Sequence, residues 1–324
     1  MNRRVLVTGA TGFIGSKLVP ALLAENYDVT ILARKPRTLS DRPWRNLVNV
    51  IEADIANSSS LMLGIKSEDF SMVLHLAAVV RRISRHISQD EYFKVNVLGT
   101  RSVCQLCVAK GIQKIIFLST ADVFGSIPRY RTPINENYPY HPTDAYSMSK
   151  VAAETVVMRF WQERKLNGII LRPTHVYGPS DPGFIPKMFK LLRLLPKIPI
   201  IGDGLTLKHF VYIDDLIGVV LNAMISKVSG AYLVADDTPV SITDFLRLFC
   251  ELQSDKKRFF RVPFPENFRS ILKSVPDNLA YPISWFYANH AYDTSLAKRE
   301  LGFKPRTNIQ EGLRIVYSLL RKDL

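Results

Sequence analysis

Short β-branched runs alternate with longer helical patterns through the first half of the chain. Strands are predicted at residues 5–7, 29–32, 48–51, 73–76, 115–118 and 169–171. Helices are predicted between them, at residues 16–25, 58–65, 90–110 and 144–165. The strand runs are almost continuously apolar, which indicates strands covered on both faces, as in a parallel sheet. The alternation therefore predicts an α/β fold, a Rossmann-type doubly wound parallel sheet.

The second half of the chain has a different pattern. Prolines crowd residues 173–199, strands and helices become irregular, and residues 307–322 predict a closing helix. We expect residues 1–173 to form a dinucleotide-binding domain that carries the catalytic residues. Residues 174–324 are expected to form mainly a substrate-binding part, whose segments can interleave with the first domain.

Charge and cysteine content narrow the class of protein. The 43 Lys and Arg exceed the 29 Asp and Glu, so the net charge is +14, which admits nucleic acid, an anionic membrane surface or small anionic ligands as partners. Three cysteines cannot form a disulfide framework, so we expect a reducing, cytoplasmic setting. No apolar run reaches the ~20 residues of a transmembrane segment, and the first residues do not resemble a signal peptide.

The chain opens on a strand, a glycine turn and a helix start. Glycines at positions 9, 12 and 15 follow the pattern G-x-x-G-x-x-G directly after the first strand. Such a turn needs positive φ and no side chain where a pyrophosphate approaches, and the helix start offers free N–H groups. The predicted cofactor contacts are Gly9, Thr11, Gly12, Phe13, Ile14 and Gly15. The alternative is a tight turn that binds no ligand.

The end of the second strand indicates which cofactor is preferred. A carboxylate there would bind the ribose 2′-hydroxyl of NAD, whereas an arginine accommodates the 2′-phosphate of NADP. This sequence has Arg34 and Lys35 and no acid, so NADP is favoured and NAD is the alternative. Arg34 could also be a solvated charge or stack on adenine. Asp54, after the third strand, could accept a hydrogen bond from adenine or cap the helix near Ser58.

Tyr146 and Lys150 lie four residues apart on one face of a predicted helix. A tyrosine is a poor base at neutral pH unless a cation stabilises the phenolate, and Lys150 supplies that charge and holds the nicotinamide ribose. Thr120 follows the fifth strand, where its hydroxyl can hydrogen-bond the reacting oxygen. We predict that Tyr146 moves a proton while hydride passes between carbon and nicotinamide. The alternative is an exposed helix face without chemistry.

Together these motifs resemble the extended short-chain dehydrogenase/reductase family, of the NAD(P)-dependent epimerase/dehydratase type, over nearly the whole chain. The resemblance is carried by Thr8–Gly15, Asp54 in Glu52–Ile55, His75–Ala78, Asn96 in Val95–Thr100, Ser119–Gly125, Pro142, Arg172–Pro179, His209–Leu216 and Glu300–Pro305. It implies Thr120, Tyr146 and Lys150 as catalytic residues. It implies further cofactor contacts from Ile55, Leu76, Ala77, Ala78, Asn96, Pro173 and Val176, although a buried structural role suits Asn96 nearly as well. Relatives often pair two long helices into a homodimer, here residues 90–110 and 144–165.

The resemblance also narrows the reaction. Members of this type mostly oxidise or reduce C4 of a nucleotide-linked sugar, and the dehydratases place an Asp-Glu pair directly after the strand-end threonine. This chain has Ala121-Asp122 there, so the acid that would protonate a leaving hydroxyl is missing. We therefore expect a 4-epimerase or a 4-keto reductase rather than a dehydratase. Arg34 favours reduction with an exchangeable cofactor.

Substrate contacts are expected from Thr120, Asp122, His175 and Lys208. Nucleotide-sugar enzymes of this type usually have Asn at the position of His175, and many have Arg at the position of Lys208 to bind the diphosphate bidentately. Residues 178–186 and 201–204 also resemble the hydroxysteroid-dehydrogenase branch of the family. The alternatives are therefore an enzyme for an apolar cyclic alcohol and a non-catalytic NAD(P)-sensing protein. Such sensors often lack the Tyr/Lys pair, which is present here.

Three further patterns are weaker. Cys104 and Cys107 have the spacing of a metal or redox pair, but no second pair follows, so core packing is expected and no metal site. A basic loop at residues 81–86, with Arg81, Arg82 and Arg85, either gathers an anionic substrate or is simply solvated. Residues 187–197 alternate cations with apolar residues, as in a helix that touches a membrane or one packed in the substrate part. No motif indicates nucleic-acid binding beyond the charge.

Overall fold

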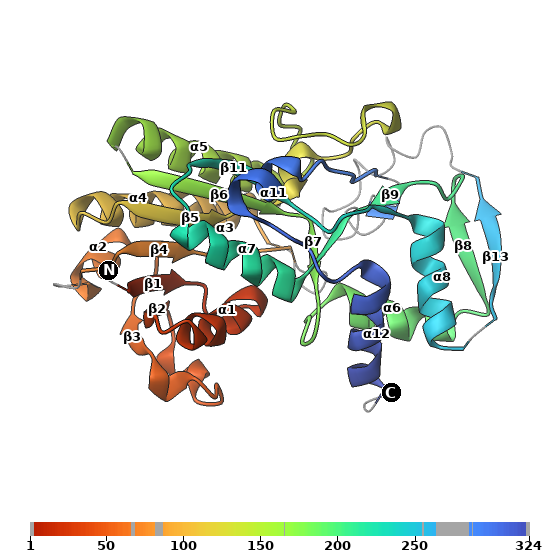
Figure 1. The fold of residues 1–324 in the computed structure, drawn as a ribbon, viewed down its shortest axis with the longest axis horizontal. Coiled ribbons are helices and arrows are strands. Elements are labelled where there is room, and N and C mark those ends of the chain that lie inside the picture. Colours follow the sequence, from red (N-terminus) through yellow and green to blue (C-terminus); the bar gives the residue numbers. More distant parts are fainter. Residues whose placement is uncertain are drawn as a thin grey trace.

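A seven-stranded sheet, parallel throughout, forms the centre of the first part of the protein (Figure 1). The computed structural model describes residues 3–65, 69–81, 87–164, 166–254, 256–263, 285–286 and 288–321. The strands are β1 (Arg4–Thr8), β2 (Asp28–Ala33), β3 (Asn49–Glu52), β4 (Met72–His75), β5 (Lys114–Leu118), β6 (Asn167–Pro173) and β11 (Gly230–Val234). Their order is β11-β6-β5-β4-β1-β2-β3, so the predicted doubly wound α/β fold is confirmed.

The carboxyl ends of the central strands meet at one edge of the sheet. Thr8 at the end of β1 is in register with His75 at the end of β4, and His75 with Phe117 of β5. The chain winds in opposite directions from β1, toward β2 on one side and β4 on the other. Open α/β sheets bind ligands outside the strand ends at such a reversal.

Helices cover both faces of the sheet. They are α1 (Phe13–Ala24), α2 (Ser58–Gly64), α3 (Gln89–Tyr92), α4 (Gly99–Ala109), α5 (Ala145–Arg164) and α7 (Ile213–Ile225). Helices α1 and α7 contact each other on one face, whereas α4 contacts α2 and α5 on the other. Because β-branched and leucine side chains point to both faces of each strand, the sheet divides two separate apolar cores.

Two helices differ in detail from their prediction. The expected helix at residues 90–110 consists of α3, a π-helical stretch at Phe93–Leu98, and α4. The start of α2 is capped by Asn57, whose side chain accepts a hydrogen bond from the Ser60 N–H at 3.0 Å. Asp54 instead accepts a hydrogen bond from the Ala56 N–H at 3.0 Å. The residue that caps α2 is therefore Asn57 and not Asp54, which the sequence suggested as a possible cap.

The second part lies beyond the strand ends, on the right of Figure 1. Its helices are α6 (Phe184–Leu194), α8 (Ile242–Leu252) and α12 (Ile309–Leu320), the last close to the expected closing helix, whereas α11 (Ser295–Leu301) packs on β11 and α7 of the first part. Its strands are β7 (His175–Tyr177), β8 (Lys197–Ile201), β9 (Leu207–Lys208), β10 (Phe210–Tyr212), β12 (Val240–Ser241) and β13 (Arg258–Val262). They form three two-stranded sheets, β7 with β10, β9 with β12 and β8 with β13.

The two parts interleave along the chain. Strand β11 and helix α7 follow residue 173 in sequence, yet β11 pairs with β6 in the central sheet and α7 packs on α1. The division into residues 1–173 and 174–324 stays a prediction. Strand β11 and helix α7, with α11 packed on them, are segments of residues 174–324 that lie with the first part. No helix in the described part of the chain is long and apolar enough to cross a membrane.

Candidate active site

The glycine turn leaves no room for side chains. Gly9 has φ +76°, and a Cβ there would lie 2.6 Å from the Ala77 nitrogen. A Cβ on Gly15 would lie 2.3 Å from the Gly9 carbonyl oxygen. Gly12 precedes α1 without any side-chain cap, so the first N–H groups of the helix stay open to an anion. The six predicted contacts of this turn thus lie together at the end of β1.

A buried hydrogen-bond chain fixes the turn against β4. Thr100 donates its hydroxyl proton to the Asn96 carbonyl at 2.6 Å, so its oxygen accepts from Nε2 of His75 at 3.0 Å. Nδ1 of His75 then accepts from the Thr8 hydroxyl at 2.7 Å, and that oxygen accepts from the Ala77 N–H at 3.2 Å. Burial, aided by the Lys150 charge, lowers the pKa of His75 to about 3, so the ring is neutral and keeps this tautomer.

Asn96 has its polar groups occupied. Its Oδ1 accepts from the Val79 N–H at 2.8 Å, and its Nδ2 donates to the Val79 carbonyl at 3.0 Å and to the Ser149 hydroxyl at 2.9 Å. This residue therefore joins the segment after β4 to helix α5, which matches the structural alternative. Its predicted cofactor contact, like those of Ile55, Leu76, Ala77, Ala78 and Pro173, stays a prediction.

A cavity of about 330 Å³ lies between the strand ends and the second part. It brings together six residues that the sequence predicted, namely Thr120, Asp122, Tyr146, His175, Val176 and Lys208. They come from segments far apart in sequence, because β5, α5, β6 and β9 all end or begin at this edge. This convergence of hydroxyl, carboxylate and imidazole groups is typical of a small-molecule site.

Lys150 lies one helical turn from Tyr146 on α5 and is not among the residues that line the cavity. Its Nζ donates to the Leu118 carbonyl at 2.7 Å and sits 4.1 Å from the centroid of the Phe117 ring. Burial lowers the pKa of Lys150 to about 7, and the Glu154 carboxylate opposes that shift. Burial likewise raises the pKa of Tyr146, against the effect of the nearby Arg81 charge. The Tyr146 phenol thus holds its proton more tightly, and the Lys150 ammonium less tightly, than each does in water, so the two pKa values move apart.

Arg81 lies against the phenol. Its guanidinium carbon is 4.4 Å from the centroid of the Tyr146 ring, and its Nη2 donates to Asp144 at 2.8 Å. It also pairs with Asp122. Burial raises the pKa of Asp144, but Arg81 and Ser147 outweigh burial and the net shift is downward. The sequence left open whether the loop with Arg81 gathers an anionic substrate or is simply solvated. In the structure Arg81 joins two carboxylates at the cavity wall. Arg82 and Arg85 lie outside the described residues.

His175 and Lys208 face an aromatic wall. The His175 ring centroid lies 4.9 Å from that of Phe184 and 6.0 Å from that of Trp285. The ammonium of Lys208 is buried, 4.3 Å from the centroid of the Trp285 ring, and donates to the backbone carbonyls of Trp285 and Ala288. Burial lowers the pKa of both His175 and Lys208. A direct diphosphate contact from Lys208 therefore stays a prediction.

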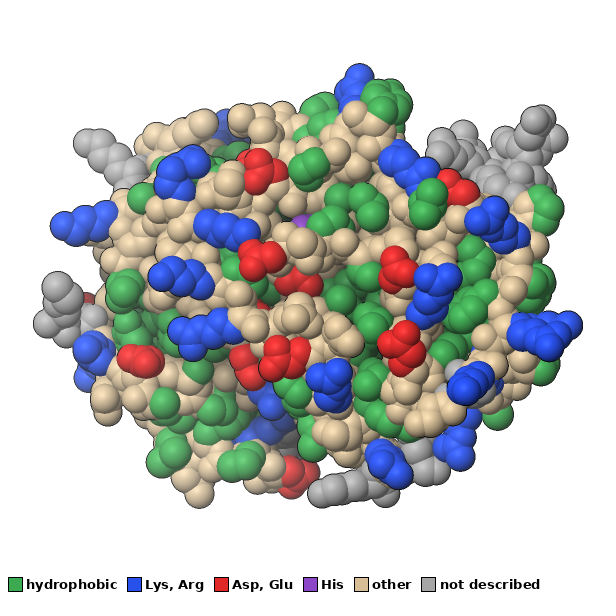
Figure 2. All heavy atoms as spheres, turned by 45° about the vertical axis from the view of Figure 1, so that its right-hand side comes forward, with side chains coloured by type: hydrophobic (Ala, Val, Ile, Leu, Met, Phe, Trp, Pro, Cys, Tyr) green, Lys and Arg blue, Asp and Glu red, His purple; other side chains and the backbone are tan. Residues whose placement is uncertain are grey.

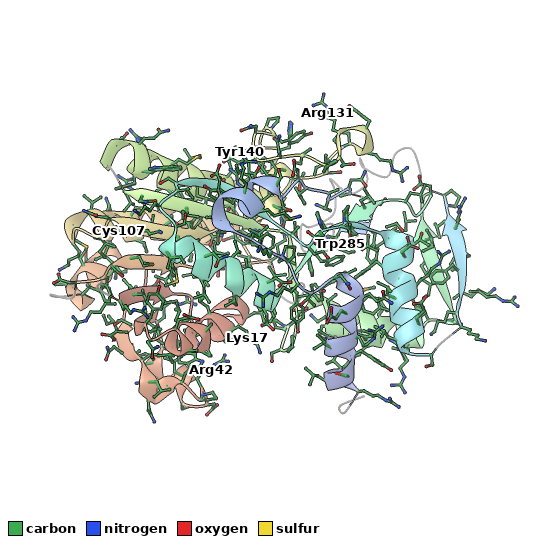
Figure 3. All side chains as sticks on the ribbon, in the orientation of Figure 1. Lys17, Arg42, Cys107, Arg131, Tyr140 and Trp285 are labelled. Atoms are coloured by element: carbon green, nitrogen blue, oxygen red, sulfur yellow. The ribbon has the colours of Figure 1, made fainter. Side chains whose placement is uncertain are left out.

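Two arginines lie where the sequence predicts the adenosine end of the cofactor. Arg34 is exposed at the end of β2, as its sequence position predicted. Nη2 of Arg42 donates to the Thr11 carbonyl at 3.3 Å, and Figure 3 labels Arg42 beside α1. Sequence reasoning missed Arg42, because it lies 31 positions from the turn and belongs to no motif.

Other cavity residues were also missed. Trp285, His290 and Tyr292 line the cavity from a segment without a recognisable motif, and Trp285 lies between the two parts of the protein (Figure 3). The buried hydroxyl of Thr174, also in the cavity wall, has no hydrogen-bond partner among the residues that the structure describes.

The predicted absence of a metal site stays a prediction. Within the described ranges, no cluster of three or more His, Cys, Asp or Glu side chains has the arrangement of a metal site. Cys104 and Cys107 are buried free thiols of α4, and burial raises the pKa of Cys104 to about 12. Both therefore pack in the core, as expected.

Comparisons with known proteins bear on this site. Mouse dTDP-D-glucose 4,6-dehydratase is 27% identical over 99% of this chain and 89% of its own. The 3beta-hydroxysteroid-dehydrogenase/decarboxylase isoform 1 of Arabidopsis thaliana is 24% identical over 97% of this chain and 78% of its own. The structure of Thermus thermophilus UDP-glucose 4-epimerase in complex with NAD has a TM-score of 0.78, with 24% identity over 99% of this chain and 100% of that one. A statistical description of the NAD dependent epimerase/dehydratase family matches residues 5–235. That match spans well over half of the chain, which therefore belongs to this family.

Proposed function

We propose that this protein transfers hydride at C4 of a nucleotide sugar, as a 4-epimerase or a 4-keto reductase. The observation that carries the proposal is the shared cavity, which Thr120, Tyr146 and Thr174 line together with Asp122 and His175. A sugar ring offers several hydroxyl oxygens to such groups. The relatives named above as a sugar dehydratase and a sugar epimerase span nearly the whole chain, which supports the same substrate class.

The chain's own residues would divide the work as follows. A bound nicotinamide cofactor supplies the hydride donor or acceptor. The glycine turn suits its pyrophosphate because the first N–H groups of α1 have no side-chain cap, while Gly9 and Gly15 pack so tightly on backbone that no side chain fits there. In the oxidation direction, Tyr146 takes the proton of the substrate hydroxyl as the carbonyl forms. Thr120 donates a hydrogen bond to that oxygen, and the Lys150 charge lowers the energy of the phenolate. In the reduction direction, Tyr146 donates its proton to the substrate carbonyl oxygen.

Cofactor choice is part of the proposal. Arg34 and Arg42 would offer two cations to a 2′-phosphate, and the end of β2 has no carboxylate to bind a 2′-hydroxyl. We therefore expect NADPH to bind more tightly than NADH, although the related epimerase structure holds NAD. Fluorescence titration of both cofactors tests this, with Arg34→Ala expected to weaken only NADPH. Equal affinities would remove the argument.

The missing acid favours epimerisation or reduction over dehydration. Ala121 follows Thr120 and is buried, and the next carboxylate, Asp122, is paired with Arg81. No carboxylic acid at these two positions is free to protonate a leaving hydroxyl. Mass analysis of products from a panel of nucleotide sugars separates the three outcomes, since only dehydration loses the mass of water.

The decisive experiment combines that panel with two tyrosine variants. Turnover is followed by NAD(P)H absorbance and by chromatography of the sugar nucleotides. Tyr146→Phe should abolish turnover while cofactor binding is kept. Tyr92→Phe is the matched control, because its ring centroid lies 5.9 Å from that of Tyr146 in the same cluster. If the unmutated protein turns over no compound of a broad panel, the NAD(P)-sensing alternative is favoured instead.

A second candidate is an enzyme for an apolar cyclic alcohol. The aromatic wall of His175, Phe184 and Trp285 favours it, because flat rings pack well on such side chains. The Arabidopsis relative carries hydroxysteroid dehydrogenase in its name. Turnover of a steroid-like alcohol, with none on any nucleotide sugar, would establish this candidate in place of the first.

We also propose a homodimer in a reducing compartment such as the cytoplasm. Apolar side chains are exposed on the π-helical stretch and on the adjoining helices α4 and α5, namely Phe93, Leu98, Val108 and Met148. A second copy of the same helices would cover them. All three cysteines are buried and unbridged, which supports reducing surroundings.

A further inference from the structure

The end of the second part farthest from the sheet carries two segments with cations and no acids. Residues 182–202 hold Lys187, Lys190, Arg193 and Lys197, and residues 256–263 hold Lys256, Lys257, Arg258 and Arg261. The adjoining helix α8 holds Asp244, Arg247 and Glu251, a net charge of only −1. Asp203 directly follows the first segment and lies near Arg261, but the eight cations of the two segments still outnumber the acids around them. The proposed active site uses none of these cations.

The fold makes these two segments one surface. Strands β8 and β13 pair in parallel with Arg258 beside Lys197 and Phe260 beside Pro199. Nζ of Lys257 donates to the carbonyls of Leu192 at 2.7 Å and Arg193 at 2.9 Å, which joins the start of β13 to the end of α6. We call the outward face of α6, β8 and β13 the basic–apolar face.

Large apolar side chains stand between these cations. On α6, Ile185, Met188, Phe189 and Leu192 are buried, while Lys187, Lys190, Leu191 and Leu194 share the opposite, exposed side of the helix. Leu194 is 81% exposed, Leu191 50% and Phe260 46%. Figure 2 shows this end of the molecule with Lys and Arg along its right-hand margin and hydrophobic side chains between them.

The combination selects one kind of partner. We propose that the basic–apolar face docks on a bilayer surface that contains anionic phospholipid. The cations are attracted to the headgroup phosphates, while Leu191, Leu194 and Phe260 enter the boundary between headgroups and acyl chains. A nucleic acid would use the cations but gain nothing from exposed leucines, so it explains only half of the surface. The proposal is independent of which substrate the cavity takes.

The test uses the full chain and vesicles of phosphatidylcholine, either pure or with about a third of phosphatidylglycerol, as an anionic surface. Sedimentation with vesicles should show binding to the anionic ones only, and 0.5 M salt should release it by screening. The variant Lys190→Glu/Leu194→Ser should lower the partition constant about tenfold or more. Both positions are exposed, so the variant should fold, which its thermal melt would verify.

A matched control changes the same kinds of residue elsewhere. Ile225, the last residue of α7, and Lys227, two residues beyond it, are exposed, so Ile225→Ser/Lys227→Glu removes one apolar side chain and reverses one charge. This control should bind as the unmutated protein does. Absence of binding to anionic vesicles, or equal losses in both variants, would overturn the proposal. So would tight binding to duplex DNA that Lys190→Glu weakens and Leu194→Ser leaves unchanged, because the surface would then recognise phosphates alone.

Discussion

Replacing Glu154 with glutamine should unfold the protein at a temperature several degrees lower. Its carboxylate, on α5, is fully buried and accepts from Nη2 of Arg172 at 2.7 Å, from the Tyr140 hydroxyl at 2.7 Å and from the Ser119 hydroxyl. Arg172 is itself only 4% exposed in its side chain. Burial lowers the pKa of Arg172, but Glu154 more than offsets this effect, so the guanidinium stays charged.

The size of the loss follows from that geometry. Glu154→Gln leaves the Arg172 charge buried without its counter-charge, which costs on the order of 3–5 kcal/mol. With an unfolding entropy of ~2.1 cal/mol/K per residue, that cost lowers Tm of a 324-residue chain by about 4–7 °C. The assay is a thermal or urea melt followed by circular dichroism. Glu163→Gln is the matched control on the same helix, because the Glu163–Arg159 pair is solvent-exposed and should leave Tm unchanged.

Two results would refute this reasoning. The first is a Tm for Glu154→Gln equal to that of Glu163→Gln, which would mean that the buried pair contributes no more than an exposed one. The second concerns the double variant Glu154→Leu/Arg172→Met, which removes both charges and should regain part of the loss. If it is less stable than Glu154→Gln by a further several kcal/mol, the unpaired charge is not the cause.

Three further predictions concern the turn, the lysine and the dimer. Gly15→Ala should abolish cofactor binding in a fluorescence titration, because its Cβ would lie 2.3 Å from the Gly9 carbonyl oxygen. Gly218→Ala in α7, whose Cβ would meet nothing within 4 Å, should bind the cofactor normally. Binding retained by both variants would contradict the tight packing of the glycine turn. Lys150 has a folded pKa of about 7 against an ordinary 10.5, so the unfolded chain binds more protons between these values and stability should rise with pH there. In Lys150→Met that rise, measured by urea melts at pH 7 and 9, should be smaller; an unchanged slope would assign it to other groups. Phe93→Glu/Leu98→Glu should convert the proposed dimer to monomers in analytical ultracentrifugation, and an unchanged dimer would place its interface elsewhere.

The sequence predicted those features that depend on local spacing. Apolar, β-branched runs identified six of the seven central strands, because a strand covered on both faces is a continuous apolar run that is visible in its own few residues. The edge strand β3 was also identified, although its residues are only partly buried or exposed. The sequence also identified the glycine turn and the Tyr146/Lys150 pair, because each motif lies within a few consecutive residues. Their roles in catalysis stay predictions that the Tyr146 variant tests.

Tertiary structure decided what comes from distant segments. Strand β11 belongs to the central sheet although it follows the expected domain boundary at residue 173. Its place depends on pairing with β6, which lies about 60 positions earlier, so its own residues do not reveal it. Trp285 lines the cavity, and the Lys208 ammonium donates to backbone carbonyls. Arg81 pairs with the carboxylates of Asp122 and Asp144, which lie 41 and 63 positions away in sequence. The surplus of positive charge was visible in the composition. The sequence did not show that some of these cations share one face with exposed leucines. That face forms only when β13 packs beside α6 and β8, because the fold, and not sequence distance, decides which residues are neighbours on the surface.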